Sequence, residues 1–136
     1  MRVFLDANIL FSAAKSAGAV RDLLRLLLDR GHECCVDGYV VIEARRNLAA
    51  KAPDALIALE ALLKRLHISS AQAPGPGLKL VNWLPEKDRI VLAAAIRLRC
   101  DALVTGDRTH FGSGYGKRFA GVTIHSPRSL AERLFG

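Results

Sequence analysis

Short apolar segments alternate with helical segments along most of this chain, and that order narrows the possible folds more than any other feature. Strands are expected at residues 2–5, 33–37, 67–69, 101–105 and 122–124. Apolar residues at helical spacing predict helices over residues 8–14, 19–30, 39–50, 53–66, 85–100 and 127–134. This order favours a parallel sheet covered on both faces and joined by right-handed crossovers. We therefore expect an α/β fold, a three-layer α/β/α sandwich around a mainly parallel sheet.

Two segments are expected to be loops because glycine and proline interrupt them. Residues 69–77 hold two prolines and two glycines within four positions, which excludes a helix or a central strand. A domain boundary there is the alternative, but acidic residues that we expect to share one site lie on both sides, so one domain over residues 1–136 is favoured. Residues 106–121 contain five glycines and lack the Walker phosphate-binding pattern, so a flexible loop is expected.

The composition fits a chain that folds around an aliphatic core. Of the 136 residues, 51% are hydrophobic and only 6% aromatic, so leucine, valine, isoleucine and alanine must fill the interior. The longest apolar run is shorter than the ~20 residues that a membrane span needs, and Asp6 follows too early for a signal peptide. Cys34, Cys35 and Cys100 form no disulfide or zinc pattern, so we expect core thiols in a reducing cytoplasm and no membrane partner.

Four acidic residues fall at positions that an α/β fold brings together. Asp6 ends the first expected strand and Asp107 follows the strand at 101–105. Glu43 and Asp88 lie near the starts of two expected helices. Because strand C-termini and the N-termini of the following helices share one edge of a parallel sheet, these four carboxylates are expected to converge there.

Clustered carboxylates repel one another unless a positive charge lies among them. Mg²⁺ or Mn²⁺ takes oxygen ligands and keeps waters for an incoming phosphate, and two such ions can activate a water and stabilise a leaving oxygen. Histidine and cysteine are expected to be scarce near the four acids, which argues against zinc. The sequence therefore predicts a site for one or two Mg²⁺ or Mn²⁺ ions.

The net charge of the chain points to a polyanionic partner. The formal charge is +7, from 20 basic and 13 acidic residues. If four acids are gathered in one cleft, 9 acids remain against 20 basic residues and the rest of the surface is near +11. A negative, cation-loaded cleft within a positive surface suits a chain of phosphates such as RNA.

These segments together resemble the PIN-domain family, metal-dependent ribonucleases that include the VapC-type toxins of toxin–antitoxin pairs. The matching segments, in order along nearly the whole chain, are residues 4–10 (FLDANIL), 41–45 (VIEAR), 85–95 (PEKDRIVLAAA), 103–111 (LVTGDRTHF), 121–124 and 126–127. The resemblance implies a PIN-like fold and a divalent-cation-dependent endoribonuclease that cleaves single-stranded or loop RNA, with an antitoxin protein and a homodimer as partners.

The resemblance also assigns residues to roles. It places the catalytic and metal-binding acids at Asp6, Glu43, Asp88 and Asp107, with Glu86 as the weaker competitor of Asp88. Supporting polar roles fall to Asn8, Ser12 and Thr105. Many relatives carry a further acid shortly after the fourth, whereas this chain has Thr109 and His110, so a second metal site has too few expected ligands.

RNA contacts are expected from basic residues near these segments, namely Arg45, Arg46, Arg108, Lys117 and Arg118. Trp83 and Tyr115 are candidates for base stacking, with ordinary packing as the alternative for Trp83. The apolar face of the helix at 53–66 is expected to be core or a dimer surface. A non-catalytic module that binds metal, RNA or a protein is the alternative function. An aspartyl-phosphate phosphotransferase is disfavoured because Asn8 stands where a second aspartate is needed.

Overall fold

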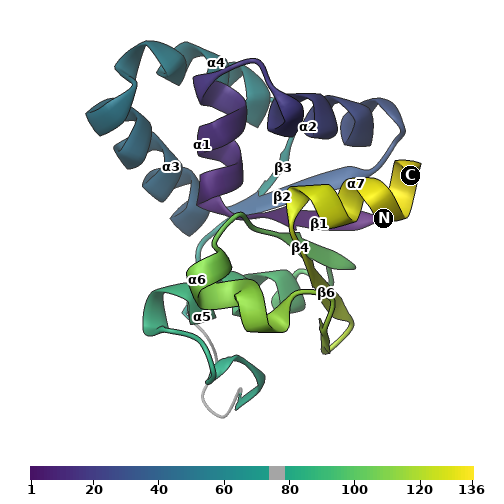
Figure 1. The fold of residues 1–136 in the computed structure, drawn as a ribbon. Coiled ribbons are helices and arrows are strands. Elements are labelled where there is room, and N and C mark those ends of the chain that lie inside the picture. The colour runs from purple at the N-terminus through teal and green to yellow at the C-terminus, as the bar shows by residue number, and fades with distance from the viewer. Residues whose placement is uncertain (74–78) are drawn as a thin grey trace.

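The computed structural model describes residues 1–73 and 79–136, and a six-stranded sheet lies at its centre (Figure 1). Part of the expected loop at 69–77 lies outside the described residues. Across the sheet, the strands run in the order β3 (His67–Ser69), β2 (Glu33–Asp37), β1 (Arg2–Leu5), β4 (Ala102–Val104), β6 (Val122–His125) and β5 (Arg118–Phe119). All neighbours pair in parallel except β5, which is antiparallel to β6 at one edge.

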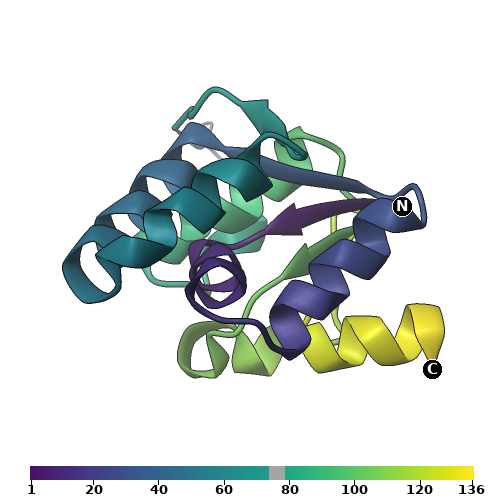
Figure 2. The same cartoon turned by 90° about the horizontal axis from the view of Figure 1, so that it is seen from above.

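Helices cover both faces of this sheet, as the alternating pattern predicts. They are α1 (Ala7–Lys15), α2 (Ala19–Asp29), α3 (Gly38–Lys51), α4 (Leu56–Leu63), α5 (Glu86–Arg97), α6 (Arg108–Phe111) and α7 (Pro127–Phe135). Helices α1 to α4 lie on one side and α5 on the other, while α7 packs beside α2 (Figures 1 and 2). The expected three-layer α/β/α fold is confirmed. Within the described ranges, no helix is long and apolar enough to cross a membrane.

The central strand β1 lies in the core of the molecule. Val3, Phe4 and Leu5 are fully buried, because β2 and β4 flank the strand and helices cover both of its faces. The three cysteines are buried free thiols, as expected. A strand enclosed in this way holds its last residue rigidly, and the chain leaves it at Asp6.

The glycine-rich segment after β4 is more structured than expected. It forms α6, a 3-10 turn at Gly112–Gly114 and the edge strand β5, so the prediction of one flexible loop over 106–121 is wrong. Gly114 is required by packing, since an added Cβ would lie 2.5 Å from the ring of Trp83. That ring stacks on Phe119 with centroids 5.2 Å apart, so Trp83 packs against the segment although 37% of it stays exposed. The glycine here allows a close approach and thereby fixes the segment.

Candidate functional site

A cavity of about 180 Å³ lies at the C-terminal ends of β1 and β4, and all four predicted carboxylates line it. The residues around it are Asp6, Ala7, Asn8, Glu43, Asn47, Lys87, Asp88, Asp107 and His110. Two strand ends, the first turn of α5 and the part of α3 that carries Glu43 and Asn47 thus meet at one edge of the sheet. Segments that are far apart in the sequence form one acidic site.

Asp6 is the most firmly held of the four acids. It caps the N-terminus of α1, and its Oδ1 accepts a hydrogen bond of 2.7 Å from the backbone N–H of Ala7. Its Oδ2 accepts bonds of 2.8 Å from the Thr105 hydroxyl and 3.2 Å from the Asn8 amide. Since each carboxylate oxygen has two acceptor positions, Oδ1 keeps one that can serve a cation.

Asn8 and Thr105 join the two strand ends into one network. The Asn8 amide nitrogen also lies 3.3 Å from the Thr105 hydroxyl, while its side-chain oxygen accepts a bond of 2.8 Å from the Gly106 N–H. Thr105 in turn accepts a bond of 3.1 Å from the Asp107 N–H. These contacts fix Asp107 relative to Asp6, which is the supporting arrangement that the resemblance implies for both polar residues.

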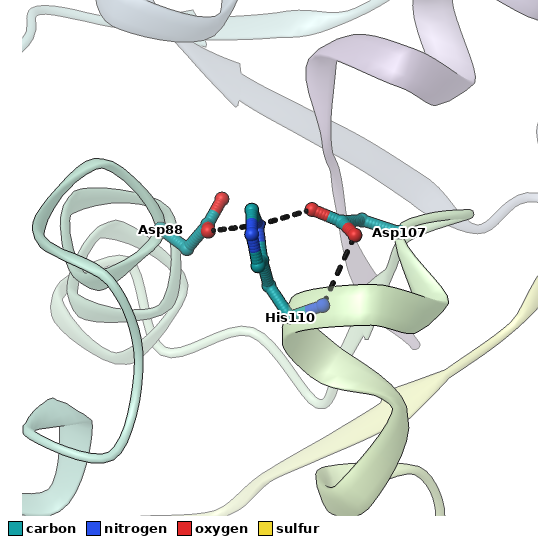
Figure 3. Close-up of side chains that lie close together, drawn as sticks. All are labelled: Asp88, Asp107 and His110. Atoms are coloured by element: carbon teal, nitrogen blue, oxygen red, sulfur yellow. Dashed lines mark hydrogen bonds and ion pairs between the residues drawn. The ribbon is translucent and has the colours of Figure 1, made fainter.

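Asp88, in the first turn of α5, and Asp107, at the N-cap of α6, both lie against the ring of His110 (Figure 3). The Nδ1 atom of His110 lies 2.8 Å from Asp88 Oδ2 and 2.8 Å from Asp107 Oδ2. Asp107 caps α6, because its Oδ1 accepts a bond of 3.1 Å from the His110 N–H. Asp88 is buried while its competitor Glu86 is exposed, so the first turn of α5 presents Asp88 to the cavity.

Glu43 approaches from α3 and forms an ion pair with Lys87. Asn47 lies four residues later on α3 and also faces the cavity, because residues four apart share one face of a helix. Lys87 is largely exposed, so its ammonium group stands at the solvent side of the site. The fourth acid is therefore balanced by a lysine.

The site raises the pKa of its most buried acid. Burial is the main cause of the increase in the pKa of Asp6 to about 6, and the charges of Asp88 and Glu43 add to it. The hydrogen bonds from Thr105 and Ala7 oppose the increase because they favour the charged form. The pKa of Asp88 is also raised, by burial and by Asp107, against the lowering effect of His110. Burial and mutual repulsion therefore disfavour the charged forms of these carboxylates, and a bound cation would stabilise them.

Several predicted residues lie elsewhere. Ser12 is exposed on α1 and does not line the cavity, so its expected supporting contact is not formed. Arg45 makes a bidentate pair with Glu60, at 2.8 and 3.0 Å, which ties α3 to α4. Arg46 is exposed on α3.

The remaining predicted RNA contacts are exposed beyond β4. Arg108 directly follows Asp107 and lines a neighbouring, mainly apolar cavity with Tyr115. The Tyr115 hydroxyl donates to the Thr105 carbonyl at 2.8 Å, so this side chain is fixed beside the site. Lys117 and Arg118 lie at the edge strand β5. Arg108 is therefore the nearest of the three to the acidic cavity in sequence and in structure.

Sequence reasoning assigned no role to three polar residues of the cavity, Asn47, Lys87 and His110. Each has a local signal, since Asn47 is four residues after Glu43, Lys87 adjoins Asp88, and His110 is three residues after Asp107. The expectation that histidine is scarce near the acids is wrong, because His110 contacts two of them. The argument against zinc from a lack of histidine near the acids is weakened accordingly.

The donor set fits a divalent cation. Four carboxylates border one small cavity, and donor atoms of Asp88, Asp107 and His110 lie within 4.8 Å of one another. Carboxylate oxygens are the ligands that Mg²⁺ and Mn²⁺ favour, and imidazole nitrogen is accepted by transition metals. The arrangement is suited to hold a divalent cation.

Solved structures share this fold at low sequence identity. VapBC2 from Rickettsia felis, solved with a DNA fragment from its promoter, matches with a TM-score of 0.65 and 17% identity, over 93% of this chain and 98% of the other. FitAcB from Neisseria gonorrhoeae matches with a TM-score of 0.65 and 16% identity over the same shares. DNA-bound VapBC from Salmonella typhimurium has a TM-score of 0.64 and 15% identity, again over 93% and 98%. At such identities the likeness establishes the fold alone.

Sequence comparisons place the chain in a family. No curated protein matches it significantly. The profile of the PIN domain matches residues 2–109, a range that contains β1 to β4 and every carboxylate of the cavity. The chain therefore belongs to the PIN domain family.

Proposed function

We propose that this chain is a divalent-cation-dependent endoribonuclease that cleaves single-stranded or loop RNA. The observation that carries the proposal is the convergence of Asp6, Glu43, Asp88 and Asp107 on one cavity at the C-terminal edge of the sheet. A surface that binds RNA without chemistry gains nothing from four anions facing the phosphates, since they repel the ligand. Membership of the PIN family favours the same activity.

In this proposal the acids divide the work. Asp6, Asp88 and Asp107 hold the cation directly or through water, while Glu43 binds it or orients the attacking water. When bound, a Mg²⁺ or Mn²⁺ ion neutralises phosphate charge, activates water and stabilises the leaving oxygen. Asn8 and Thr105 keep Asp6 in position through their hydrogen bonds. Lys87 forms an ion pair with Glu43 at the solvent side of the cavity and so offsets part of the negative charge of the acids.

RNA is the proposed substrate because of the charge distribution. The acids of the cavity leave an excess of basic residues over the rest of the chain. Arg108 is exposed immediately after Asp107, where a phosphate next to the cleaved one would pass. Arg45 is a poorer candidate, since its guanidinium is already paired with Glu60.

We also propose that the chain is the toxin of a toxin–antitoxin pair. The support is the resemblance to VapC-type toxins and the shared fold with VapBC2 and FitAcB. A small protein encoded upstream that co-purifies with the chain and stops its cleavage of RNA would agree with this. Cleavage that every neighbouring gene product leaves unchanged would contradict it.

Two acids in the first turn of α5 provide a matched test. Asp88 lines the cavity while Glu86, two residues earlier, is exposed to solvent. We expect Asp88→Asn to reduce cleavage of a labelled single-stranded RNA in Mn²⁺ about 10²-fold or more, as loss of a key electrostatic group does. Glu86→Gln should leave the rate within about twofold, because exposed charges contribute little. EDTA should stop cleavage by the unchanged chain.

The outcome separates cutting from binding. If the unchanged chain retains RNA on a filter but yields no products in Mg²⁺ or Mn²⁺, the nuclease proposal is wrong and the non-catalytic module is favoured. Equal rates for the two variants would also contradict it, since the cavity would then have no part in the reaction.

A further inference from the structure

His110 lies between two carboxylates of the cavity, on the short helix α6 that follows Asp107 (Figure 3). Its Nδ1 atom is 2.8 Å from an oxygen of Asp88 and 2.8 Å from an oxygen of Asp107. A ring nitrogen carries either one hydrogen or one lone pair, so it can donate only one proton to the two oxygens. Two anionic oxygens and one nitrogen therefore meet at one place, which is the pattern of a ligand set.

The backbone of α6 fixes this arrangement. Asp107 caps the helix, and its Oδ1 accepts a bond of 3.1 Å from the His110 N–H. That bond directs the other oxygen of Asp107, Oδ2, toward the ring nitrogen of His110. The side chain of His110 is still 44% exposed, so a hydrated ion from solvent reaches the nitrogen without opening the core.

We propose that His110 supplies a nitrogen ligand to the cation of this site and that the site therefore prefers Mn²⁺ to Mg²⁺. Mg²⁺ is a hard ion that takes oxygen ligands almost exclusively, whereas affinity for imidazole rises among the transition metals. In this cavity a ring nitrogen lies beside the carboxylate oxygens of Asp88 and Asp107, so the available ligands are not oxygen alone. The inference rests on the proposed function only in placing a cation in this cavity.

Metal titrations of the full chain test the preference without measuring activity. We expect calorimetry to give tighter binding for Mn²⁺ than for Mg²⁺. Since loss of even a supporting partner weakens metal binding about 10–100-fold, His110→Ala should weaken Mn²⁺ binding at least about tenfold and Mg²⁺ binding much less. His110→Asp should strengthen Mg²⁺ binding, because it adds an oxygen ligand and a negative charge. His67→Ala, which changes an exposed histidine on β3, should alter neither.

A spectroscopic measurement tests the ligand itself. Pulsed electron paramagnetic resonance of the chain with Mn²⁺ should show coupling to ¹⁴N that is retained in His67→Ala and lost in His110→Ala. Labelling the histidines with ¹⁵N should change that coupling accordingly. The proposal is overturned if the coupling is absent, if it survives in His110→Ala, or if that variant binds Mn²⁺ as tightly as the unchanged chain.

These results are independent of the nuclease proposal. A chain that shows the nitrogen coupling but cuts no RNA keeps this inference and loses the proposed function. A chain whose cleavage depends on Asp88 but whose Mn²⁺ shows no nitrogen coupling keeps the proposed function and loses this inference.

Discussion

Asp6 and Asp37 occupy equivalent local positions and have different roles. Each follows or ends a buried parallel strand, each caps the next helix, and each is at least 95% buried, with exposures of 5% and 1%. Asp6 accepts from the Ala7 N–H at 2.7 Å, and Asp37 accepts from the Val40 N–H at 3.0 Å. Local sequence and capping geometry therefore do not distinguish a site residue from a structural one.

The neighbours of each carboxylate make the difference. Asp37 faces the guanidinium of Arg97 at 3.9 Å, a positive charge that opposes the effect of burial on its pKa. Asp6 faces Asp88 and Glu43, negative charges that raise its pKa further. Asp37 thus has a cationic partner within the fold, whereas Asp6 lies among like charges. A cation bound in the cavity would therefore stabilise the charged form of Asp6.

The largest expected effect is on cleavage. Asp6→Ala should reduce RNA cleavage in Mn²⁺ about 10²–10³-fold, because a central electrostatic group is lost. Asp37→Ala should leave the rate per folded molecule within a few fold, because its partner is Arg97 and not the cavity. Single-turnover cleavage rates of the two variants should be compared after each is divided by the folded fraction, which circular dichroism measures. If both variants lose a similar fraction of the cleavage rate, Asp6 and Asp37 do not differ in role as described.

The next effect is on stability and falls on Asp37. Asp37→Ala removes the cap of α3 and leaves Arg97 facing an apolar methyl group. The loss of an N-cap costs about 0.5–2 kcal/mol, and we expect a value of this order in urea unfolding. Asp37→Asn, which retains a capping oxygen, should recover most of it. Wild-type stability in the alanine variant would show that the cap contributes nothing here.

The smallest effect has the opposite sign and falls on Asp6. Its folded-state pKa of about 6 exceeds the ordinary value of 3.8, so the folded form binds the proton more tightly than the unfolded form. The protein should therefore lose stability as the pH rises from about 4 to 6 and little thereafter. Asp6→Asn lacks this loss and should be about 1 kcal/mol more stable at pH 7 in EDTA, after the cost of altered hydrogen bonds.

Urea unfolding at several pH values between 4 and 7 checks this prediction. The advantage of Asp6→Asn should grow as the pH rises through this range and then level off. If it is constant, or if the variant is less stable at pH 7, the cavity does not destabilise the charged form of Asp6 and the account of its electrostatics is wrong.

The sequence predicted the sheet and the convergence of the acids because both follow from the order of strands and helices. Asp6 and Asp107 were found because they follow strands, and Asp88 because it begins a helix. The partners of these residues were harder to find. His110 reaches Asp88 across α5 and α6, and Lys87 reaches Glu43 across α5 and α3. A local signal places Lys87 and His110 near one acid each, but their contacts to the acids of other helices depend on the tertiary fold.

Predictions failed where packing decides the role of a residue. Arg45 was predicted to contact RNA, but in the structure it forms an ion pair with Glu60 of α4. Asp6 caps the N-terminus of α1 beside the cavity, whereas Ser12 lies further along the helix and does not line the cavity. Gly114 was read as a source of flexibility, whereas the ring of Trp83 requires a residue without a side chain. For Arg45 and Gly114 the deciding side chain belongs to another segment of the chain.

Thermal unfolding with and without Mn²⁺ tests the central claim that the four carboxylates coexist by sharing a cation. For a ligand that binds only the folded state at about 100 times its Kd, the gain is about 2.7 kcal/mol, which shifts Tm by several degrees. We expect this increase for the unchanged chain and not for the double variant Asp6→Asn, Asp88→Asn. An unchanged Tm in Mn²⁺, or an equal increase in the double variant, would contradict the account.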